Sequence, residues 1–212
     1  MSNQRIQAEL ARFISTAMSP LLMPFYGILI ATWISPLCLL SAGQRLEVVL
    51  ITLGLTCVTP VMFIAILHNL NIITDKRLID RKERTVPYSF AAFCYLALAG
   101  YLLYTHRPQW LVMFAAGGTM TLLTTAIVNR RWKISAHAAG SAGVLAMLYQ
   151  LKVLNLEVID PRAMVFIILF SIICCGLVGS ARLILKRHTL SQVFAGYANG
   201  FFWVTVLMYF FS

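Results

Sequence analysis

The stretch Ala163–Ala181, AMVFIILFSIICCGLVGSA, contains no charged residue. An α-helix rises about 1.5 Å per residue, so this stretch can cross the roughly 30 Å hydrocarbon core of a bilayer. Six further predominantly apolar stretches are Ser19–Leu40, Leu46–Leu70, Tyr88–Tyr104, Trp110–Val128, Ala138–Leu154 and Gln192–Phe211. We therefore expect an all-α integral membrane protein, a bundle of about seven transmembrane helices.

The composition excludes a water-soluble protein. Sixty per cent of the 212 residues are apolar and 11% are charged, whereas soluble domains carry roughly 25% charged residues. Helices satisfy their own backbone hydrogen bonds in lipid, and no alternating barrel pattern is visible. No repeat or long linker divides the chain, so residues 1–212 are predicted to form a single domain.

The basic residues are distributed unevenly along the chain. With seven spans, 13 of the 17 Lys and Arg residues fall on the side of the N-terminus. The positive-inside rule predicts that this side is cytoplasmic, and we expect a multi-pass protein of a bacterial inner membrane. The net charge of +10 is assigned to these loops and to anionic lipid headgroups, with no nucleic acid as a partner.

Three polar segments, 75–87, 132–137 and 180–192, adjoin predicted helix ends on that same side. Each contains arginine or lysine, and the last two each contain a histidine. A basic loop beside a helix is usually only a topology signal, so the functional interpretation depends on all three occurring together. Arginine binds phosphate oxygens bidentately, and a helix N-terminus capped by Ser135 favours an anion. We expect the segments to meet and form a phosphate site.

Histidine chemistry fits such a site better than metal chemistry. One histidine can attack phosphorus while a second protonates the leaving oxygen. A pair of metal ions needs several carboxylates, and beyond Glu9 this side holds only Asp75, Asp80 and Glu83. We therefore expect neither a metal nor another cofactor.

The order and spacing of these residues resemble the type 2 phosphatidic acid phosphatase superfamily over roughly residues 77–200. Arg77, six residues and Arg84 are similar to its first motif, Lys-x6-Arg-Pro. Ile134-Ser135-Ala136-His137 is similar to its Pro-Ser-Gly-His motif. Ala181-Arg182, five residues, His188, three residues and Gln192 are similar to Ser-Arg-x5-His-x3-Asp.

The resemblance implies a six-helix phosphatase-like core and a role for each matching residue. His188 would be the nucleophile that forms a phosphohistidine, and His137 the general acid. The residues expected to bind phosphate are Arg77, Arg84, Ser135 and Arg182, with Lys76 and Lys133 as helpers that have no clear counterpart in the family.

Gln192 is the most consequential departure from the family pattern, because it stands where the family has an aspartate. A glutamine carbonyl can accept the Nδ1 proton of His188 and fix the tautomer, but it cannot stabilise an imidazolium as a carboxylate does. We predict a hydrogen bond between His188 Nδ1 and the Gln192 side-chain oxygen.

The expected function is a hydrolase for phosphoric esters or diphosphates, acting on a membrane lipid whose tail stays in the bilayer. Phosphatidate, phosphatidylglycerophosphate, a polyprenyl diphosphate and a lipid A phosphate all remain open as substrates, and so does the oligomeric state. One alternative is a phosphotransferase. Another is a catalytically weak lipid-phosphate binding or transport protein, which Gln192 favours. An ion channel is disfavoured because the predicted helices carry few charges.

Overall fold

The computed structural model describes residues 3–75, 78 and 80–211. These residues form helices and no strand. The α-helices are α1 (Asn3–Ala17), α2 (Met23–Ile34), α3 (Ala42–Leu53), α4 (Thr59–Asn69), α5 (Thr85–Tyr104), α6 (Gln109–Asn129), α7 (Ala136–Val153), α8 (Pro161–Ile184) and α9 (Leu190–Phe211). Shorter helical segments are η1 (Pro36–Leu39), η2 (Gly54–Val58) and η3 (Lys82–Arg84).

Among the described residues, five helical segments are long and apolar enough to cross a membrane. They are α3 to α4, η3 with α5, α6, α8 and α9. The chain is therefore an integral membrane protein. Two of the seven predicted spans are not long and apolar enough to be counted here. Helix α2 has only 12 residues, and α7 is rich in small and polar residues. Neighbouring helices bury much of α7, so it does not need a strongly lipophilic surface.

The second predicted span is broken where the sequence places Pro60. A π-helical segment, η2, precedes Pro60 and separates α3 from α4. Proline cannot donate a backbone hydrogen bond, so a helix must adjust before it. The hydroxyl of Thr56, within η2, donates to the backbone oxygens of Thr52 and Leu21. Pro60 is therefore accommodated by a short change of helical geometry, which Thr56 connects to the segment that precedes α2.

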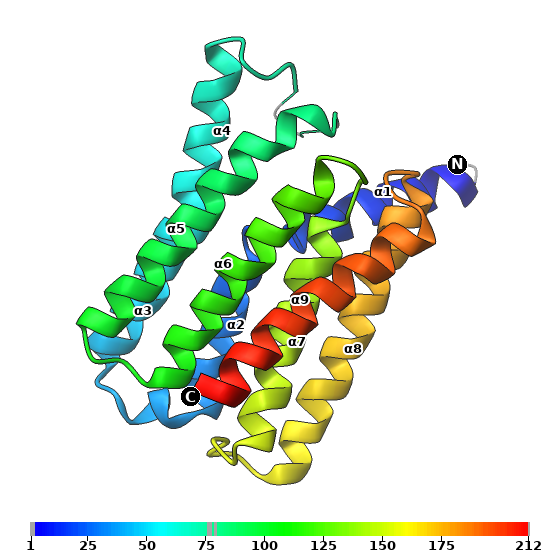
Figure 1. Cartoon of the computed structure of the whole chain (residues 1–212). Coiled ribbons are helices and arrows are strands. Elements are labelled where there is room, and N and C mark those ends of the chain that lie inside the picture. The colour runs from blue at the N-terminus through cyan, green and yellow to red at the C-terminus, as the bar shows by residue number, and fades with distance from the viewer. Residues whose placement is uncertain (1–2, 76–77, 79, 212) are drawn as a thin grey trace.

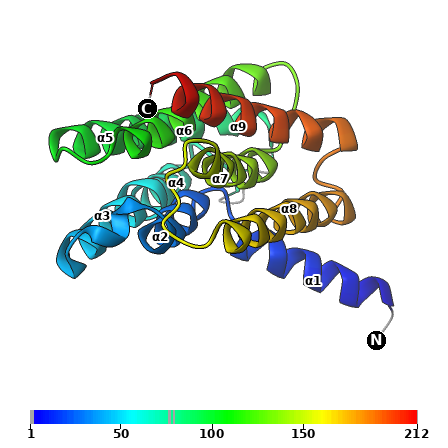
Figure 2. The same cartoon turned by 90° about the horizontal axis from the view of Figure 1, so that it is seen from below.

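Helix α7 lies between α9 on one side and α2 and α8 on the other (Figure 2). The approach of α9 to α7 depends on two glycines. A methyl group added to Gly200 would overlap the carbonyl of Ala139, and one added to Gly196 would overlap the carbonyl of Ser135. The backbone N–H of Ser135 also donates to the carbonyl oxygen of Gln192 (3.2 Å). These contacts hold the N-terminal end of α7 against the first turns of α9.

The two ends of the bundle differ. The N-terminus and the turns that follow α4, α6 and α8 lie at the same end, whereas the C-terminal end of α9 lies at the other (Figure 1). The largest fully buried side chains, including Leu102, Leu111, Leu148 and Met208, belong to the half near the C-terminus. Toward the opposite end α4 extends beyond the other helices (Figure 1), and that half holds a cavity.

Candidate functional site

A cavity of about 480 Å³ lies at the end of the bundle that carries the basic turns. Four predicted site residues from three separate segments line it, namely Arg84, His137, Arg182 and His188. Arg12 and Arg187 also line it, although the sequence analysis gave them no role. The structure therefore brings together the core of the predicted site, from parts of the chain up to about 100 residues apart.

His188 is held by the predicted hydrogen bond. Its Nδ1 lies 3.2 Å from Oε1 of Gln192, and the backbone nitrogen of Thr189 lies 3.2 Å from the same oxygen. A backbone N–H can only donate, so this contact identifies the Gln192 atom as the oxygen and not the amide nitrogen. That oxygen can only accept, so Nδ1 of His188 carries a proton. Nε2 of the neutral ring is then left with a lone pair.

The surroundings of His188 keep its ring neutral. The side chain is buried, with 8% of the residue surface exposed. Burial lowers the pKa of His188 to about 3, and the charges of Arg182, Arg84 and Lys133 act in the same direction. Desolvation and like charge both disfavour the protonated ring. At neutral pH His188 is therefore in the form that can act as a nucleophile.

His137 is bound to the first helix through Ser15. Nε2 of His137 lies 3.1 Å from the backbone oxygen of Ser15. A carbonyl only accepts, so Nε2 carries the proton in this contact. The hydroxyl of Ser15 also accepts a hydrogen bond of 2.6 Å from Nη1 of Arg182. One buried serine thus contacts both His137 and Arg182.

Ser15 lines the cavity but was not among the site residues predicted from the sequence. A signal was nevertheless present. Ala8, Ala11 and Ser15 are spaced by three and four residues, so these small side chains share one face of a helix. Such a row allows close packing, and α1 uses it to lie against α8.

Arg84, which is buried, and Arg182, which is half-buried, supply donors beside the histidines. Nε of Arg84 donates to the backbone oxygen of Leu78 (2.7 Å), and only 6% of the Arg84 surface is exposed. Nε of Arg182 is buried and has no hydrogen-bond partner among the residues that the structure describes. A buried donor without a partner is costly unless an acceptor binds to it. Arg182 can therefore donate to the oxygen of an anion in the cavity.

The remaining predicted phosphate ligands are placed differently. Ser135 is fully buried, caps α7 by accepting from the backbone N–H of Ala138 (3.3 Å), and does not line the cavity. Lys133 lies near the cavity without lining it; burial lowers its pKa, as do the charges of Arg84 and Arg182. Lys76 and Arg77 lie outside the described residues.

The charges of the cavity favour an anion. Its described lining contains four arginines and no aspartate or glutamate. Like charges at this density repel one another in a medium of reduced dielectric constant, and a bound anion relieves the repulsion. Within the described part of the chain, no group of three or more His, Cys, Asp or Glu side chains is arranged to hold a metal ion.

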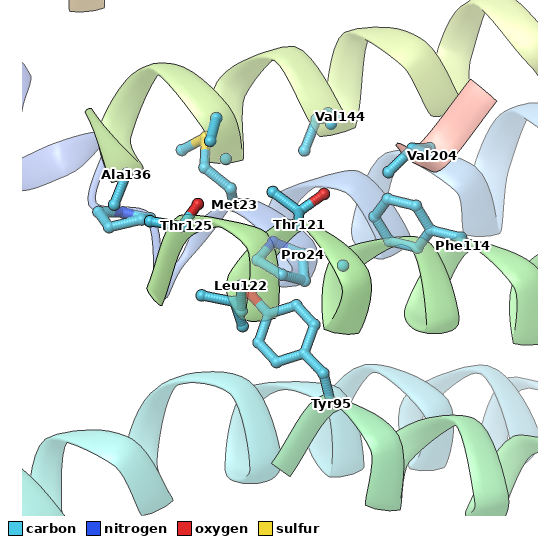
Figure 3. Close-up of a pocket in the computed structure, with 15 residues that line it drawn as sticks. Met23, Pro24, Tyr95, Phe114, Thr121, Leu122, Thr125, Ala136, Val144 and Val204 are labelled. Atoms are coloured by element: carbon cyan, nitrogen blue, oxygen red, sulfur yellow. The ribbon is translucent and has the colours of Figure 1, made fainter. Parts of the chain in front are cut away.

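A second, apolar pocket of about 50 Å³ adjoins this cavity. Figure 3 shows Tyr95, Leu122 and Ala136 around it, with Met23 and Val144 further along. Tyr95, Leu122 and Ala136 also line the basic cavity. The charged space and the apolar space therefore share walls inside the bundle, an arrangement suited to a ligand with an anionic head and an apolar tail.

Comparison with known proteins gives no match: no family model fits the sequence, and neither a curated protein nor a solved structure is detectably similar to the chain.

Proposed function

We propose that this chain is a metal-independent phosphatase that acts on a membrane lipid phosphate or diphosphate through a phosphohistidine at His188. The single observation that carries the proposal is the pairing of His188 Nδ1 with Oε1 of Gln192 (3.2 Å) in a cavity lined by arginines. That pairing leaves Nε2 of a neutral imidazole as a nucleophile among groups that attract phosphate. The resemblance to the type 2 phosphatidic acid phosphatase superfamily supports the same chemistry.

The proposed reaction has two steps. Nε2 of His188 attacks phosphorus, the bond to the lipid oxygen breaks, and His137 gives that oxygen a proton. Arg84 and Arg182 donate hydrogen bonds to the phosphoryl oxygens, which carry more charge in the transition state. Water then attacks the phosphohistidine, His137 takes a proton from it, and inorganic phosphate and free His188 are released.

His137 must be protonated for the first step. Its Nε2–H contacts the backbone oxygen of Ser15, and the neighbouring arginines disfavour a further positive charge. A bound phosphate brings negative charge close to the ring and favours the imidazolium. We propose that substrate binding itself charges His137, so that the general acid forms only when a leaving oxygen is present.

The finer topology belongs to the same proposal. Seven membrane-crossing segments, with a six-helix phosphatase-like core, would use α2 with η1 and α7 as further spans. The 13 basic residues on the side of the N-terminus favour a cytoplasmic site in a bacterial inner membrane.

The direct test is phosphate release from a panel of lipid phosphates in detergent with EDTA present. The panel contains phosphatidate, phosphatidylglycerophosphate, a polyprenyl diphosphate and a lipid A phosphate. We expect the parent chain to release phosphate from at least one of them, and His188→Ala to be inactive. His106→Ala is the matched control, since His106 is an exposed histidine in the turn between α5 and α6. Equal rates for parent and His188→Ala would refute the mechanism.

A binding or transport protein for lipid phosphates is the second candidate, and Gln192 favours it. A neutral amide stabilises the imidazolium-like charge of a phosphohistidine less than a carboxylate does. On this alternative the parent binds the lipids of the panel without turnover, and binding weakens in Arg182→Gln. Phosphate release from the parent would exclude it.

A further inference from the structure

Helix α1 has three distinct faces. Successive residues are separated by about 100° around a helix, which places Ala11 and Ser15 on a buried face that packs against α8. Arg12 and Thr16 lie on the next face, and both line the basic cavity. One face of α1 therefore packs against the rest of the protein, and the next borders the cavity.

The third face is apolar and uncovered. Ile6, Leu10 and Phe13 follow the helical spacing of four and three residues, and 43%, 57% and 71% of their surfaces are exposed. The described part of the chain places nothing over this row. Three large apolar side chains in one row are costly in water, at about 25 cal/mol for each Å² of exposed apolar surface.

The position of α1 indicates what covers this row. Figures 1 and 2 show α1 beside α8 on the outside of the bundle, projecting from it at the end that carries the basic turns. Helix α8, on which it packs, itself exposes Ile173, Leu177 and Ile184. The apolar row of α1 thus adjoins a helix that faces lipid along its length.

The charges of α1 agree with this position. Arg5 and Arg12 are exposed, whereas Glu9 is its only acidic residue and pairs with Arg12 (2.7 Å). An amphipathic helix with a basic polar face and an apolar face lies in the interfacial region of an anionic bilayer. We propose that Ile6, Leu10 and Phe13 bind the headgroup–acyl boundary of the membrane, so that α1 is an interfacial helix that forms one wall of the cavity at the membrane surface.

This surface connects the bilayer to the candidate site. Ser15, one face away from the apolar row, contacts His137 and Arg182. Membrane binding by α1 would therefore also position Ser15, and through it His137 and Arg182, near the lipid headgroups. The proposal concerns only membrane contact and does not require catalysis, so it can fail or succeed independently of the phosphatase.

The test uses nitroxide labels on the full chain in vesicles of equal parts phosphatidylcholine and phosphatidylglycerol. Cysteines are introduced singly as Ile6→Cys, Leu10→Cys and Phe13→Cys, with Gln7→Cys and Glu9→Cys as matched controls on the same helix. The unmodified chain, whose five cysteines lie in apolar helices, gives the background. The measurement is the ratio of collision rates with apolar oxygen and with a polar nickel chelate.

We expect this ratio to be several-fold higher at positions 6, 10 and 13 than at 7 and 9. Equal ratios at all five positions would show a water-exposed α1 and overturn the proposal. Shielding of positions 6, 10 and 13 from both reagents, with dipolar broadening between labels, would show that a second copy of the chain covers the row and would also overturn it.

Discussion

Nδ1 of His188 and Oε1 of Gln192 lie 3.2 Å apart, and Thr189 contributes its backbone N–H to the same oxygen. Gln192 therefore has two roles, because it orients the histidine and also satisfies a backbone donor at the start of α9. The histidine and its partner are four residues apart, and the turn from His188 into α9 places both side chains together.

Substitutions at Gln192 distinguish the phosphatase hypothesis from the binding-protein hypothesis. Gln192→Ala should lose roughly 10- to 100-fold in the rate of lipid phosphate hydrolysis, the range usual for positioning an acid or base. Gln192→Asp should match or exceed the parent, because a carboxylate also stabilises the imidazolium. Initial rates of phosphate release measure both effects.

Ser191→Ala is the matched control for these variants, since Ser191 lies in the same turn and its hydroxyl contacts only that of Thr189 among the described contacts. If Gln192→Ala hydrolyses the lipid as fast as the parent, Gln192 does not orient His188 for catalysis. Activity that appears only in Gln192→Asp, with a silent parent, would favour the binding protein.

The pH dependence follows from the lowered pKa of His188, about 3 in the folded chain against about 6.5 when unfolded. The unfolded state binds the proton more readily, so the stabilisation from neutral His188 is fully present above pH 6.5. It is lost as the pH falls through the folded pKa. Titration of the ring by NMR in detergent, with His188→Ala to assign the signal, should show a neutral ring at pH 5. Arg182→Gln should raise this pKa, and an unchanged value would contradict the electrostatic argument.

Ser15→Ala should loosen the first helix. It removes the acceptor of a hydrogen bond from the half-buried Arg182 (2.6 Å), and bonds to charged groups contribute about 1.5–3 kcal/mol. We expect faster amide hydrogen exchange in α1 by roughly 10- to 100-fold, with little change in α5. Thr16→Ala, an exposed neighbour, should exchange like the parent. Unchanged exchange in Ser15→Ala would show that the contact does not hold α1.

Gly200→Ala should destabilise the packing of α9 on α7. The added methyl group would overlap the carbonyl of Ala139, and forced overpacking costs about 1–3 kcal/mol. Gly176→Ala on α8 is the control, because nothing lies within 4 Å of its added methyl group. Thermal unfolding in detergent should show a lower Tm for Gly200→Ala only. Equal Tm values would mean that the helices can separate at little cost.

Sidedness can be measured at the C-terminus. The C-terminal end of α9 lies opposite the basic turns (Figure 1), and the positive-inside rule assigns those turns to the cytoplasm. A reporter fused after Ser212 that works only outside the cytoplasm should therefore be active, whereas the same reporter fused before Met1 should be silent. The reverse result would invert the proposed orientation of the site.

The sequence by itself determined that this protein lies in a membrane, and it located the polar segments that meet at one end of the bundle. Uncharged stretches such as Ala163–Ala181 require a bilayer, because hydrophobic length is a local property of the chain. The contact between His188 and Gln192 could also be predicted from the sequence, because residues four apart at the start of a helix can meet without help from the rest of the fold.

Only the tertiary structure decided which residues share the cavity. Ser15 and Arg182 are 167 positions apart, and their contact depends on how α1 packs against α8. The row of small residues marks the packing face of α1, but it does not indicate which helix that face contacts. Contact with α9 holds the buried Ser135 away from the cavity, and the arrangement of the helices brings Arg12 and Arg187 to the cavity wall. Local spacing determines which residues can be neighbours on one helix, whereas close packing between helices selects among contacts that the sequence leaves open.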